Sequence, residues 1–430
     1  RQPNEILLLA FGKDAQKEME ERISEKLSAA VGSQLTVNTF HSLGIKIISE
    51  VTGARPSLSK LAENQNNELA TFVRETIATR LKEGSFYNLM MKWFSEFFAP
   101  YESEFNFENQ GQYWDYVRKN KIISLKGDAV KSFEECEVAN FLYLNGVKYE
   151  YEADYKHDTR TETKAQYRPD FYLIDFDIYI EHLGLKGFGR TAPYVDRRSY
   201  IQSAIWKRKL HKRLGTNLIE TYSCEKSQGI LTERLREKLL QRGVNFQPLS
   251  SDEVFTVLNE RKQIDEFTKL VITFLGHYKG AQLTESDLGN KINKLENTAR
   301  HQAFINVFLP IYESYQEKLK SEDKIDFHDM ISEATELVKS GKYSNPFGYV
   351  MVDEFQDISV GRSKLIKALQ ENNPDTQIFC VGDDWQAIYR FTGADINIMK
   401  QFEENFGASS RSDLSKTFRC EEKITEHAKH

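Results

Sequence analysis

The sequence predicts an α/β protein in which a parallel sheet is split by a long helical insertion, and the insertion carries a second α/β module. Apolar runs at residues 5–11 and 349–352 indicate buried strands near the two ends of the chain. Residues 55–130 and 251–341 have the charged, amphipathic pattern of helices. Residues 131–225 instead alternate between helical and short strand-like runs. A chain of 430 residues is long enough for several domains.

Charge and cysteine usage restrict the class of protein. The formal net charge is −6 with 28% charged residues, so any nucleic-acid contact must be local. The four cysteines lie far apart without a CxxC pair, which favours a reducing compartment over a disulfide framework or a zinc site. No apolar run approaches about 18 residues and no signal peptide opens the chain, so we expect a soluble, cytoplasmic protein.

Polar side chains follow two strands in the stretch from residue 349 to residue 386. The run at 349–352 is followed by Asp353 and Glu354, and a second apolar run at 378–382 ends in Asp383. A helical segment at 363–371 joins the two, which makes one βαβ unit. Ligands of open α/β sheets sit at the carboxyl ends of the strands, so both polar loops should meet at one edge.

The residue types at this edge suit nucleotide hydrolysis. Asp353 offers the hard oxygen ligand that Mg²⁺ requires. Glu354 is the candidate carboxylate that orients and deprotonates an attacking water. Gln356 and Gln386 could sense the γ-phosphate or the water by hydrogen bonding.

Residues 353–357 (DEFQD) and 382–395 (GDDWQAIYRFTGAD) resemble motifs II and III of superfamily 1 DNA helicases of the UvrD/Rep-like group, and the likeness is greatest to the helicase IV branch. The resemblance implies a RecA-like P-loop NTPase motor domain with ATP and Mg²⁺ as cofactors. It also implies 3′–5′ movement on single-stranded or partly duplex DNA in repair or recombination, by a protein that is expected to be monomeric and needs no membrane. Of the motif III aromatics, Trp385 and Tyr389 are candidate DNA contacts, and Trp385 is the best candidate for an exposed stacking platform.

Four further segments resemble motifs of the same family. Residues 5–29 resemble motif Ia, and residues 35–42 resemble motif Ib. Residues 325–330 resemble the short motif before motif II, with Asp326 as the N-cap of a helix. Residues 414–420 resemble motif IV, and Arg419 should reach the γ-phosphate. In motif Ib the resemblance gives phosphate contacts and a base platform, the candidate residues being Thr39, Phe40, His41 and Ser42.

The chain contains no G-x-x-x-x-G-K-[ST] phosphate-binding loop, and nothing in it resembles motifs V and VI. We therefore expect a fragment that begins just after this loop and hydrolyses ATP negligibly by itself. We expect five segments. Residues 1–54 and 345–430 form the two parts of the motor domain, and residues 55–130 and 227–344 form the two parts of the helical insertion. Residues 131–226 form the module between them.

The module at 131–226 resembles the PD-(D/E)xK nuclease fold, which is restriction-endonuclease-like. Its expected elements are a helix at 132–142, strands at 148–155, 167–174, 178–184 and 217–222, and a helix at 200–214. Asp170 matches the acid of the PD pair, Glu181 the second acid, and Glu135 the acid on the first helix. These carboxylates would hold a divalent metal that activates water against a phosphodiester, which requires all three to converge with Asp170 and Glu181 on one side.

The lysine of the nuclease pattern is missing, because Leu183 stands two residues after Glu181. Lys207 or Lys209 on the following helix could take its place. That helix lies in a basic run beside Trp206, with a single acid, Asp196, and is a candidate track for the DNA backbone; the eight cations are Arg190, Arg197, Arg198, Lys207, Arg208, Lys209, Lys212 and Arg213.

Two other classes of function stay open beside the helicase. One is a metal-dependent DNA nuclease, which requires a lysine partner for Glu181 in space. The other is a non-catalytic DNA-binding fragment, which the missing phosphate-binding loop favours for this chain taken alone.

Overall fold

The computed structural model describes residues 2–63, 67–98, 101–120, 122–162, 165–295, 298–387 and 393–414. The predictions for Tyr389 and Arg419 lie outside these residues. The chain forms two compact units: the first contains Arg1–Glu63, Thr273–Thr284 and Leu319–His430, and the second contains Asn64–Ile272 and Glu285–Lys318. Among the described residues, no helix has the length and apolar character needed to cross a membrane.

The first unit is built on a parallel sheet with the strand order β2-β1-β7-β8. Its strands are β1 (Ile6–Ala10), β2 (Thr36–Thr39), β7 (Tyr349–Val352) and β8 (Gln377–Cys380). Leu7 of β1 is paired with Val350 of β7, so two segments more than 300 residues apart in sequence lie side by side. The predicted parallel sheet built from both ends of the chain is therefore confirmed.

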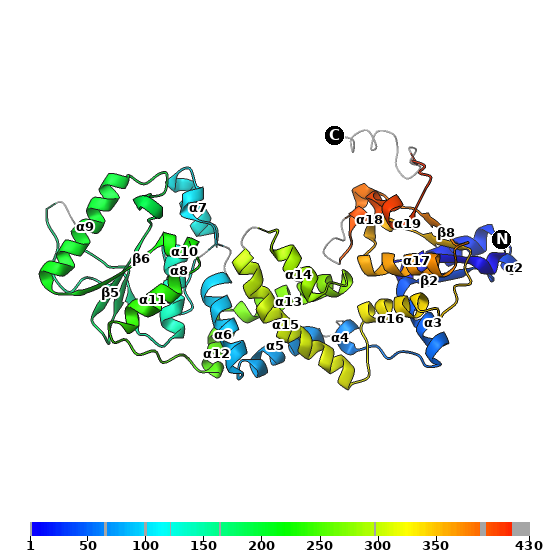
Figure 1. Cartoon of the computed structure of the whole chain (residues 1–430), viewed down its shortest axis with the longest axis horizontal. Helices are drawn as coiled ribbons and strands as arrows, with labels where there is room; N and C mark the ends of the chain where they lie inside the picture. Colours follow the sequence, from blue (N-terminus) through cyan, green and yellow to red (C-terminus); the bar gives the residue numbers. More distant parts are fainter. Residues whose placement is uncertain are drawn as a thin grey trace. The chain divides into compact units, whose positions relative to one another are not determined.

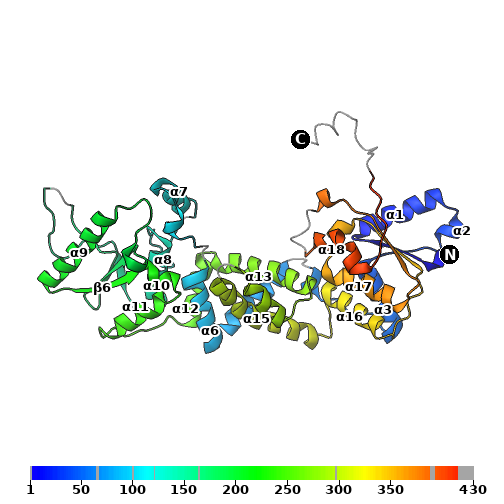
Figure 2. The same ribbon diagram turned by 45° about the horizontal axis from the view of Figure 1, so that its top comes forward.

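Helices on one face of this sheet close the core of the first unit. Leu7, Leu9 and Val350 of the strands pack with Ile47 of α3 and Ala334 of α16, and all five side chains are buried. Figure 2 shows α1 and α2 on the other side of the strands from α3 and α16. The helices are α1 (Lys13–Lys26), α2 (Ala29–Gly32), α3 (Phe40–Thr52), α4 (Lys60–Glu63), α16 (Phe327–Lys339), α17 (Val360–Asn372), α18 (Ile396–Lys400) and α19 (Phe402–Phe406).

The second unit has its own sheet, with the order β3-β4-β5-β6. Its strands are β3 (Tyr149–Tyr151), β4 (Phe171–Leu173), β5 (Ile178–Leu183) and β6 (Asn217–Tyr222). β5 is antiparallel to β4 and parallel to β6. Helices α8 (Phe133–Leu144) and α11 (Leu231–Leu240) pack on one face, and α9 (Arg197–Leu214) packs on the other through Leu210 and Trp206 (Figure 1).

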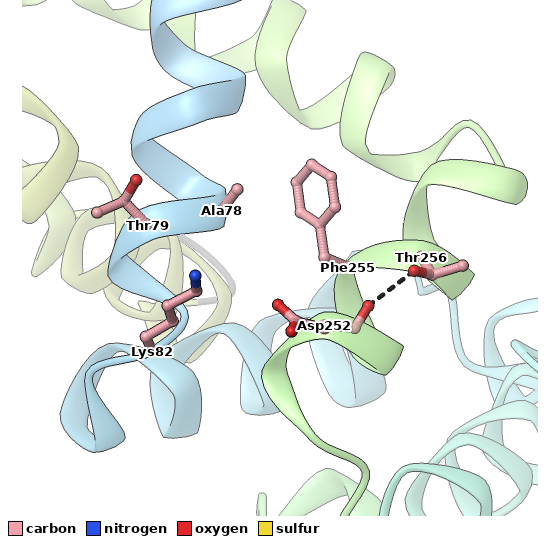
Figure 3. Close-up of a pocket in the computed structure, with 6 residues that line it drawn as sticks. All are labelled: Ala78, Thr79, Lys82, Asp252, Phe255 and Thr256. Atoms are coloured by element: carbon pink, nitrogen blue, oxygen red, sulfur yellow. Dashed lines mark hydrogen bonds between the residues drawn. The ribbon is translucent and has the colours of Figure 1, made fainter.

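The remaining elements of the second unit are helical. They are α5 (Glu68–Arg80), α6 (Gly84–Lys92), α7 (Gln110–Asn120), α10 (Ser223–Ser227), α12 (Ser251–Glu260) and α14 (Glu285–Ile292), and α13 (Gln263–Gly280) and α15 (Thr298–Ser321) extend from this unit into the first. A pocket of about 220 Å³ lies between α5 and α12, beside Thr79 and Asp252 (Figure 3). The Asp252 carbonyl accepts a hydrogen bond from Thr256 there, at 2.8 Å. None of the residues lining this pocket belongs to a motif named above.

Candidate functional site

The candidate nucleotide site lies at the carboxyl end of β7. Asp353 and Glu354 follow the strand directly, and both side chains are exposed. Glu354 has a φ of +50°, in the left-handed region, which a residue with a side chain adopts only when its surroundings hold it there. Its backbone N–H donates to the Asp353 carboxylate at 3.0 Å. The turn thus points two carboxylates out of the edge of the sheet.

Gln356 joins this turn to the loop that follows β8. Its side chain is only 2% exposed. The amide nitrogen donates to the Glu354 carboxylate at 2.6 Å, and the amide oxygen accepts from the backbone N–H of Asp383 at 3.0 Å. A buried amide with both ends satisfied holds its two partners in a fixed relation. Gln356 therefore positions Glu354 relative to the second polar loop, a role that the sequence could not distinguish from phosphate sensing.

The second polar loop is held close to Gln356 by Gly382. A Cβ placed on Gly382 would lie 2.8 Å from the Gln356 amide oxygen, so no side chain fits at this position. Asp383 accepts from the backbone N–H of Trp385 at 3.1 Å and from the Gln386 amide at 2.7 Å. Trp385 is 93% exposed, as expected for a stacking platform. The predicted meeting of the two polar loops at one sheet edge is confirmed.

The chemistry of this edge fits a magnesium–nucleotide complex. Asp353 presents an exposed carboxylate at the strand end, and Mg²⁺ is commonly held by one or two carboxylates while phosphate oxygens and water complete its shell. Within the described ranges, no group of three or more His, Cys, Asp or Glu side chains could hold a metal by itself. A magnesium ion at this edge would need oxygen ligands from a nucleotide and water beside Asp353.

Motif Ib is placed at the end of β2, and one of its predictions is wrong. Phe40 was expected to form a base platform, but it is 1% exposed and packs against Phe11 with a ring-centroid distance of 5.3 Å. Burying the apolar ring of Phe40 in the core stabilises the fold more than leaving it exposed at the surface. The Thr39 hydroxyl accepts from the backbone N–H of Ser42 and caps α3. Burial, with Arg362 and His328 nearby, lowers the pKa of His41 to about 4, so its imidazole is neutral near pH 7.

Arg362 is a residue of the first unit that the sequence analysis missed. Its guanidinium lies 5.0 Å from the centre of the Phe11 ring and 5.5 Å from that of Phe40, on rings from motifs Ia and Ib. Burial lowers its pKa, an effect that the charge of Asp357 opposes. A cation in the first turn of α17 gives no sign in the sequence that its guanidinium lies over two aromatic rings.

The second unit brings two of the three predicted nuclease acids together. β4 and β5 pair so that Phe171 lies opposite Ile180, and the same register places Asp170 opposite Glu181. Residues directly opposite in an antiparallel pair point to the same face. The backbone N–H of His182 donates to the Asp170 carboxylate at 2.6 Å. Burial and the charges of Glu181 and Glu135 raise the pKa of Asp170 well above its ordinary value, a repulsion that a bound cation would relieve.

Lys207 supplies the cation that Leu183 cannot. Its ammonium is ion-paired with the Glu181 carboxylate, which is 1% exposed. Tyr167 donates a second hydrogen bond to Glu181 at 2.5 Å. Burial raises the pKa of Glu181, while Lys207 and Tyr167 oppose that rise. Of the two lysines proposed from sequence, Lys207 is therefore the partner of Glu181, whereas Lys209 is exposed.

Among the described residues, Glu135 does not join Asp170 and Glu181 in a group that could hold a metal, although its charge acts on both. Glu135 accepts hydrogen bonds from Ser132, the N-cap residue of α8, and from Tyr151 of β3. Its carboxylate is thus held by donors of its own, and the part of the chain that the structure describes contains no three-acid group arranged for a metal. Asp170 and Glu181 remain a two-carboxylate arrangement, which suits Mg²⁺ when phosphate and water supply the other ligands.

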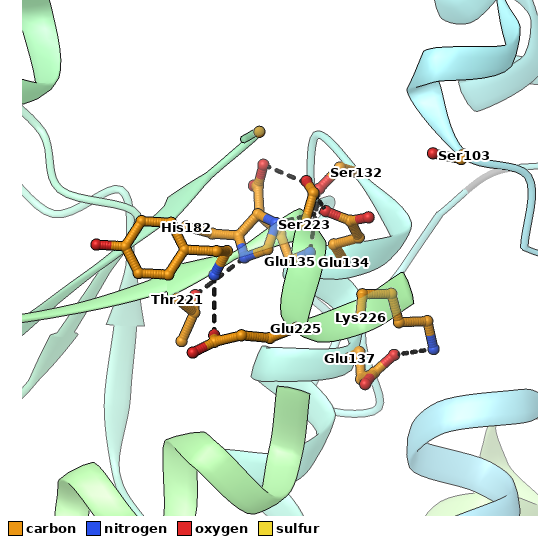
Figure 4. Close-up of polar contacts among 12 residues, drawn as sticks. Ser103, Ser132, Glu134, Glu135, Glu137, His182, Thr221, Ser223, Glu225 and Lys226 are labelled. Atoms are coloured by element: carbon orange, nitrogen blue, oxygen red, sulfur yellow. Dashed lines mark hydrogen bonds and ion pairs between the residues drawn. The ribbon is translucent and has the colours of Figure 1, made fainter. Parts of the chain in front are cut away.

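A buried ion pair between His182 and Glu134 lies next to Asp170 in space, and the sequence did not predict it. The His182 imidazole lies 2.6 Å from the Glu134 carboxylate, which also accepts from Ser223 (Figure 4). Burial alone would lower the pKa of His182, but Glu134 outweighs it and raises the pKa to about 9. Burial likewise would raise the pKa of Glu134, but His182, Ser223 and Tyr101 lower it to about 2. The Asp170 carboxylate accepts a hydrogen bond from the His182 backbone N–H, so the His182–Glu134 ion pair helps to hold Asp170 in position.

A known family matches most of the chain, and individual related proteins match shorter parts of it. Residues 1–407 match the UvrD/REP helicase N-terminal domain. DNA helicase IV of Escherichia coli (strain K12) is 42% identical over 124 residues, which is 29% of this chain and 18% of that protein. DNA helicase II of Rickettsia typhi is 27% identical over 205 residues, or 44% of this chain and 29% of that protein. ATP-dependent DNA helicase PcrA of Leuconostoc citreum is 28% identical over 135 residues, which is 30% of this chain and 18% of that protein.

The matched segments span less than a third of the length of these relatives. The family match itself extends from the strand β1 through both polar loops and includes the second unit. Together with the carboxylates at the edge of a parallel sheet, it shows that the chain belongs to the UvrD/REP helicase family.

Proposed function

We propose that the protein acts as an ATP-dependent DNA helicase or translocase that moves 3′–5′ along single-stranded DNA, in repair or recombination. The observation that carries the proposal is the pair of hydrogen bonds made by Gln356, from Glu354 to the backbone of Asp383. It supports a direct mechanical link between the residue that activates water and the loop that carries the exposed Trp385. A motor requires such a link between hydrolysis and DNA.

Each residue at the edge of the sheet has a proposed task. Asp353 would hold the Mg²⁺ of the bound ATP, and the ion would neutralise charge on the phosphates. Glu354 accepts the proton of the attacking water, and Gln356 keeps its carboxylate in place. Gln386 and Arg419 would contact the γ-phosphate.

The proposed DNA contacts are made by polar and aromatic groups outside the nucleotide site. Thr39, His41 and Ser42 would contact the DNA backbone from the end of β2. Trp385 and Tyr389 would stack on bases.

The test is an unwinding assay with the full-length protein on partial duplexes that carry either a 3′ or a 5′ single-stranded tail. ATP and Mg²⁺ should release the strand from the 3′-tailed substrate only. Release from the 5′-tailed substrate only would contradict the polarity, and release from neither would contradict the helicase activity.

A variant of Gln356 tests the proposed link itself. Gln356→Ala should keep ATP binding but lose most of the stimulation of hydrolysis by DNA, since Glu354 loses its positioning contact. Gln370→Ala, which changes an amide on α17 whose partner is the Phe406 carbonyl, is the matched control and should keep the stimulation. Full stimulation in Gln356→Ala would contradict the link.

A second candidate function is favoured by the Lys207–Glu181 ion pair beside Asp170. It is hydrolysis of a DNA phosphodiester by the second unit with a divalent metal. Asp170 and Glu181 would hold the metal, which would lower the pKa of a bound water, and Lys207 would stabilise negative charge on the phosphate. Nicking of DNA that depends on Mn²⁺ and disappears in Asp170→Ala would support this function. Its absence in the folded protein with either Mg²⁺ or Mn²⁺ would contradict it.

A further inference from the structure

A pocket of about 480 Å³ opens beside the two acids of the second unit. Its volume falls within the range of small-molecule sites, about 300–1,000 Å³. Aromatic and cationic side chains line it together: Tyr167, Trp206, Lys131, Arg168 and Lys207. The pocket lies between α9 and the segment that leads into β4, with Lys131 and Glu152 also in its lining.

Two side chains are shared by the pocket and the acidic centre. Tyr167 lines the pocket and donates to Glu181 at 2.5 Å, and Lys207 lines it and is ion-paired with the same carboxylate. A group bound in the pocket is therefore one side chain away from Glu181. The rings of Tyr167 and Trp206 meet edge to face, with centroids 5.7 Å apart, which sets the orientation of the indole at the wall.

The charges of the pocket suit an anion. Arg168 pairs with Asp154 at 2.6 Å and Lys131 pairs with Glu152, but the side chains of Arg168 and Lys131 are 59% and 55% exposed. Exposed ion pairs are weak, so a phosphate can compete for these two cations. Tyr167 is 6% exposed, so the partly buried Trp206 is the ring available to a base. An indole beside cations is a combination that binds nucleotides, with the base on the ring and the phosphate on the charges.

We infer that this pocket holds one unpaired nucleotide of a DNA strand and places the adjoining phosphodiester at Asp170, Glu181 and Lys207. The inference rests on the second candidate function and names its substrate class, single-stranded DNA. A base in duplex DNA is stacked on its neighbours and cannot enter a side pocket without being extruded. Hydrolysis at this place adds water across a phosphodiester: the water oxygen bonds to phosphorus, the bond to one sugar oxygen breaks, and that oxygen takes the proton.

The fluorescence of Trp206 tests the inference in the full chain. Replacing Trp114 and Trp385 by Phe leaves Trp206 and the buried Trp93 as the fluorophores of this chain. A deoxythymidine decamer, added without divalent metal so that no cleavage occurs, should quench the emission, and adding Trp206→Phe should remove the quenching. A blunt duplex of the same length should quench far less.

Variants that keep Trp206 measure the pocket itself. Arg168→Ala should raise the half-quenching concentration of the decamer about fivefold or more, because it removes a phosphate contact. Arg118→Ala, an equal loss of charge at an exposed arginine of α7 that is paired with Asp115, is the control and should change it less than about twofold. Binding of the decamer is detected separately by fluorescence anisotropy. If the decamer binds and the emission of Trp206 does not change, the inference is overturned. Equal quenching by the duplex would also overturn it.

The failure of this inference can be told apart from the failure of the nuclease function. Quenching by the decamer without any cleavage in Mn²⁺ would leave the nucleotide pocket standing and remove the nuclease function. Cleavage that disappears in Asp170→Asn, without any quenching of Trp206 fluorescence by the decamer, would support the nuclease function and contradict the nucleotide pocket.

Discussion

Replacing Lys207 by Ala should destabilise the second unit by an amount that depends on pH. The substitution leaves Glu181, which is 1% exposed, without its cation. A buried carboxylate without a partner takes up a proton instead of staying charged. Protonating at pH 7 a glutamate whose ordinary pKa is 4.5 costs about 3.5 kcal/mol, at about 1.4 kcal/mol per pH unit, and this sets the upper limit of the loss.

The pH dependence identifies the cause of the loss. At pH 5 the same protonation costs less than about 1 kcal/mol, so most of the difference between Lys207→Ala and the unaltered chain should disappear. Loss of packing by the lysine stem would instead give a difference that is the same at both pH values.

Urea unfolding at pH 7 and pH 5, followed by tryptophan fluorescence, measures this difference. In a Trp385→Phe background every remaining tryptophan of the chain lies in the second unit, so the signal reports that unit. Lys209→Ala, an exposed neighbour on α9, should change the free energy of unfolding by less than about 0.5 kcal/mol. An equal loss at both pH values in Lys207→Ala would refute the reasoning.

Three more substitutions have specific expected results. The pKa of His182 is raised to about 9 and that of Glu134 is lowered to about 2, so the stability that their pairing adds is complete between about pH 4.5 and 6.5 and is lost as pH rises through 9. The stability difference between the unaltered chain and His182→Gln should therefore shrink from pH 6 to pH 9.5 in denaturation experiments, and a constant difference would contradict the ion pair. Gly382→Ala should lower the thermal stability of the first unit by about 1–3 kcal/mol, because its Cβ would lie 2.8 Å from the Gln356 amide oxygen; an unchanged Tm would show that the loop can move aside. Trp385→Ala should weaken binding of single-stranded DNA by about 1–3 kcal/mol without unfolding the chain, and unchanged affinity would remove the stacking role.

Elements bounded by sharp changes of polarity were predicted well from sequence. The predicted strands at 349–352 and 217–222 match β7 and β6 to the residue. Each is an apolar or alternating run that ends at charged or polar residues, so burial alone fixes its limits. Asp326 caps α16 as expected, accepting from the backbone N–H groups of His328 and Asp329.

Element limits set by single side chains were predicted less well. α9 begins at Arg197 instead of residue 200, because Asp196 accepts from the backbone N–H of Ser199 and caps the helix earlier. β4 begins only at Phe171, whereas the predicted strand began at residue 167. Pro169, which lacks an N–H, cannot donate to a sheet ladder.

Contacts between distant residues were beyond the sequence. Nothing in the sequence distinguishes Lys207 from Lys209 as the partner of Glu181, since the choice depends on which side of α9 faces the sheet. Phe40 was a candidate base platform because of its neighbours in motif Ib, while its burial depends on Phe11 and Arg362 from other elements. Gln356 was recognised in the sequence as a candidate polar residue of the site. Its hydrogen bonds to Glu354 and Asp383 were not predicted, because these partners lie in different loops.

Hydrolysis of ATP by the full-length protein with Glu354→Gln tests the central claim most directly. The substitution keeps the size of the side chain and its place at the end of β7, and removes the carboxylate that accepts the proton of the attacking water. We predict that DNA-stimulated hydrolysis falls by at least about a hundredfold while ATP still binds with nearly unchanged affinity, as measured by equilibrium binding of a fluorescent ATP analogue. Hydrolysis at the rate of the unaltered protein would contradict the assignment of Glu354 and the motor site built around it.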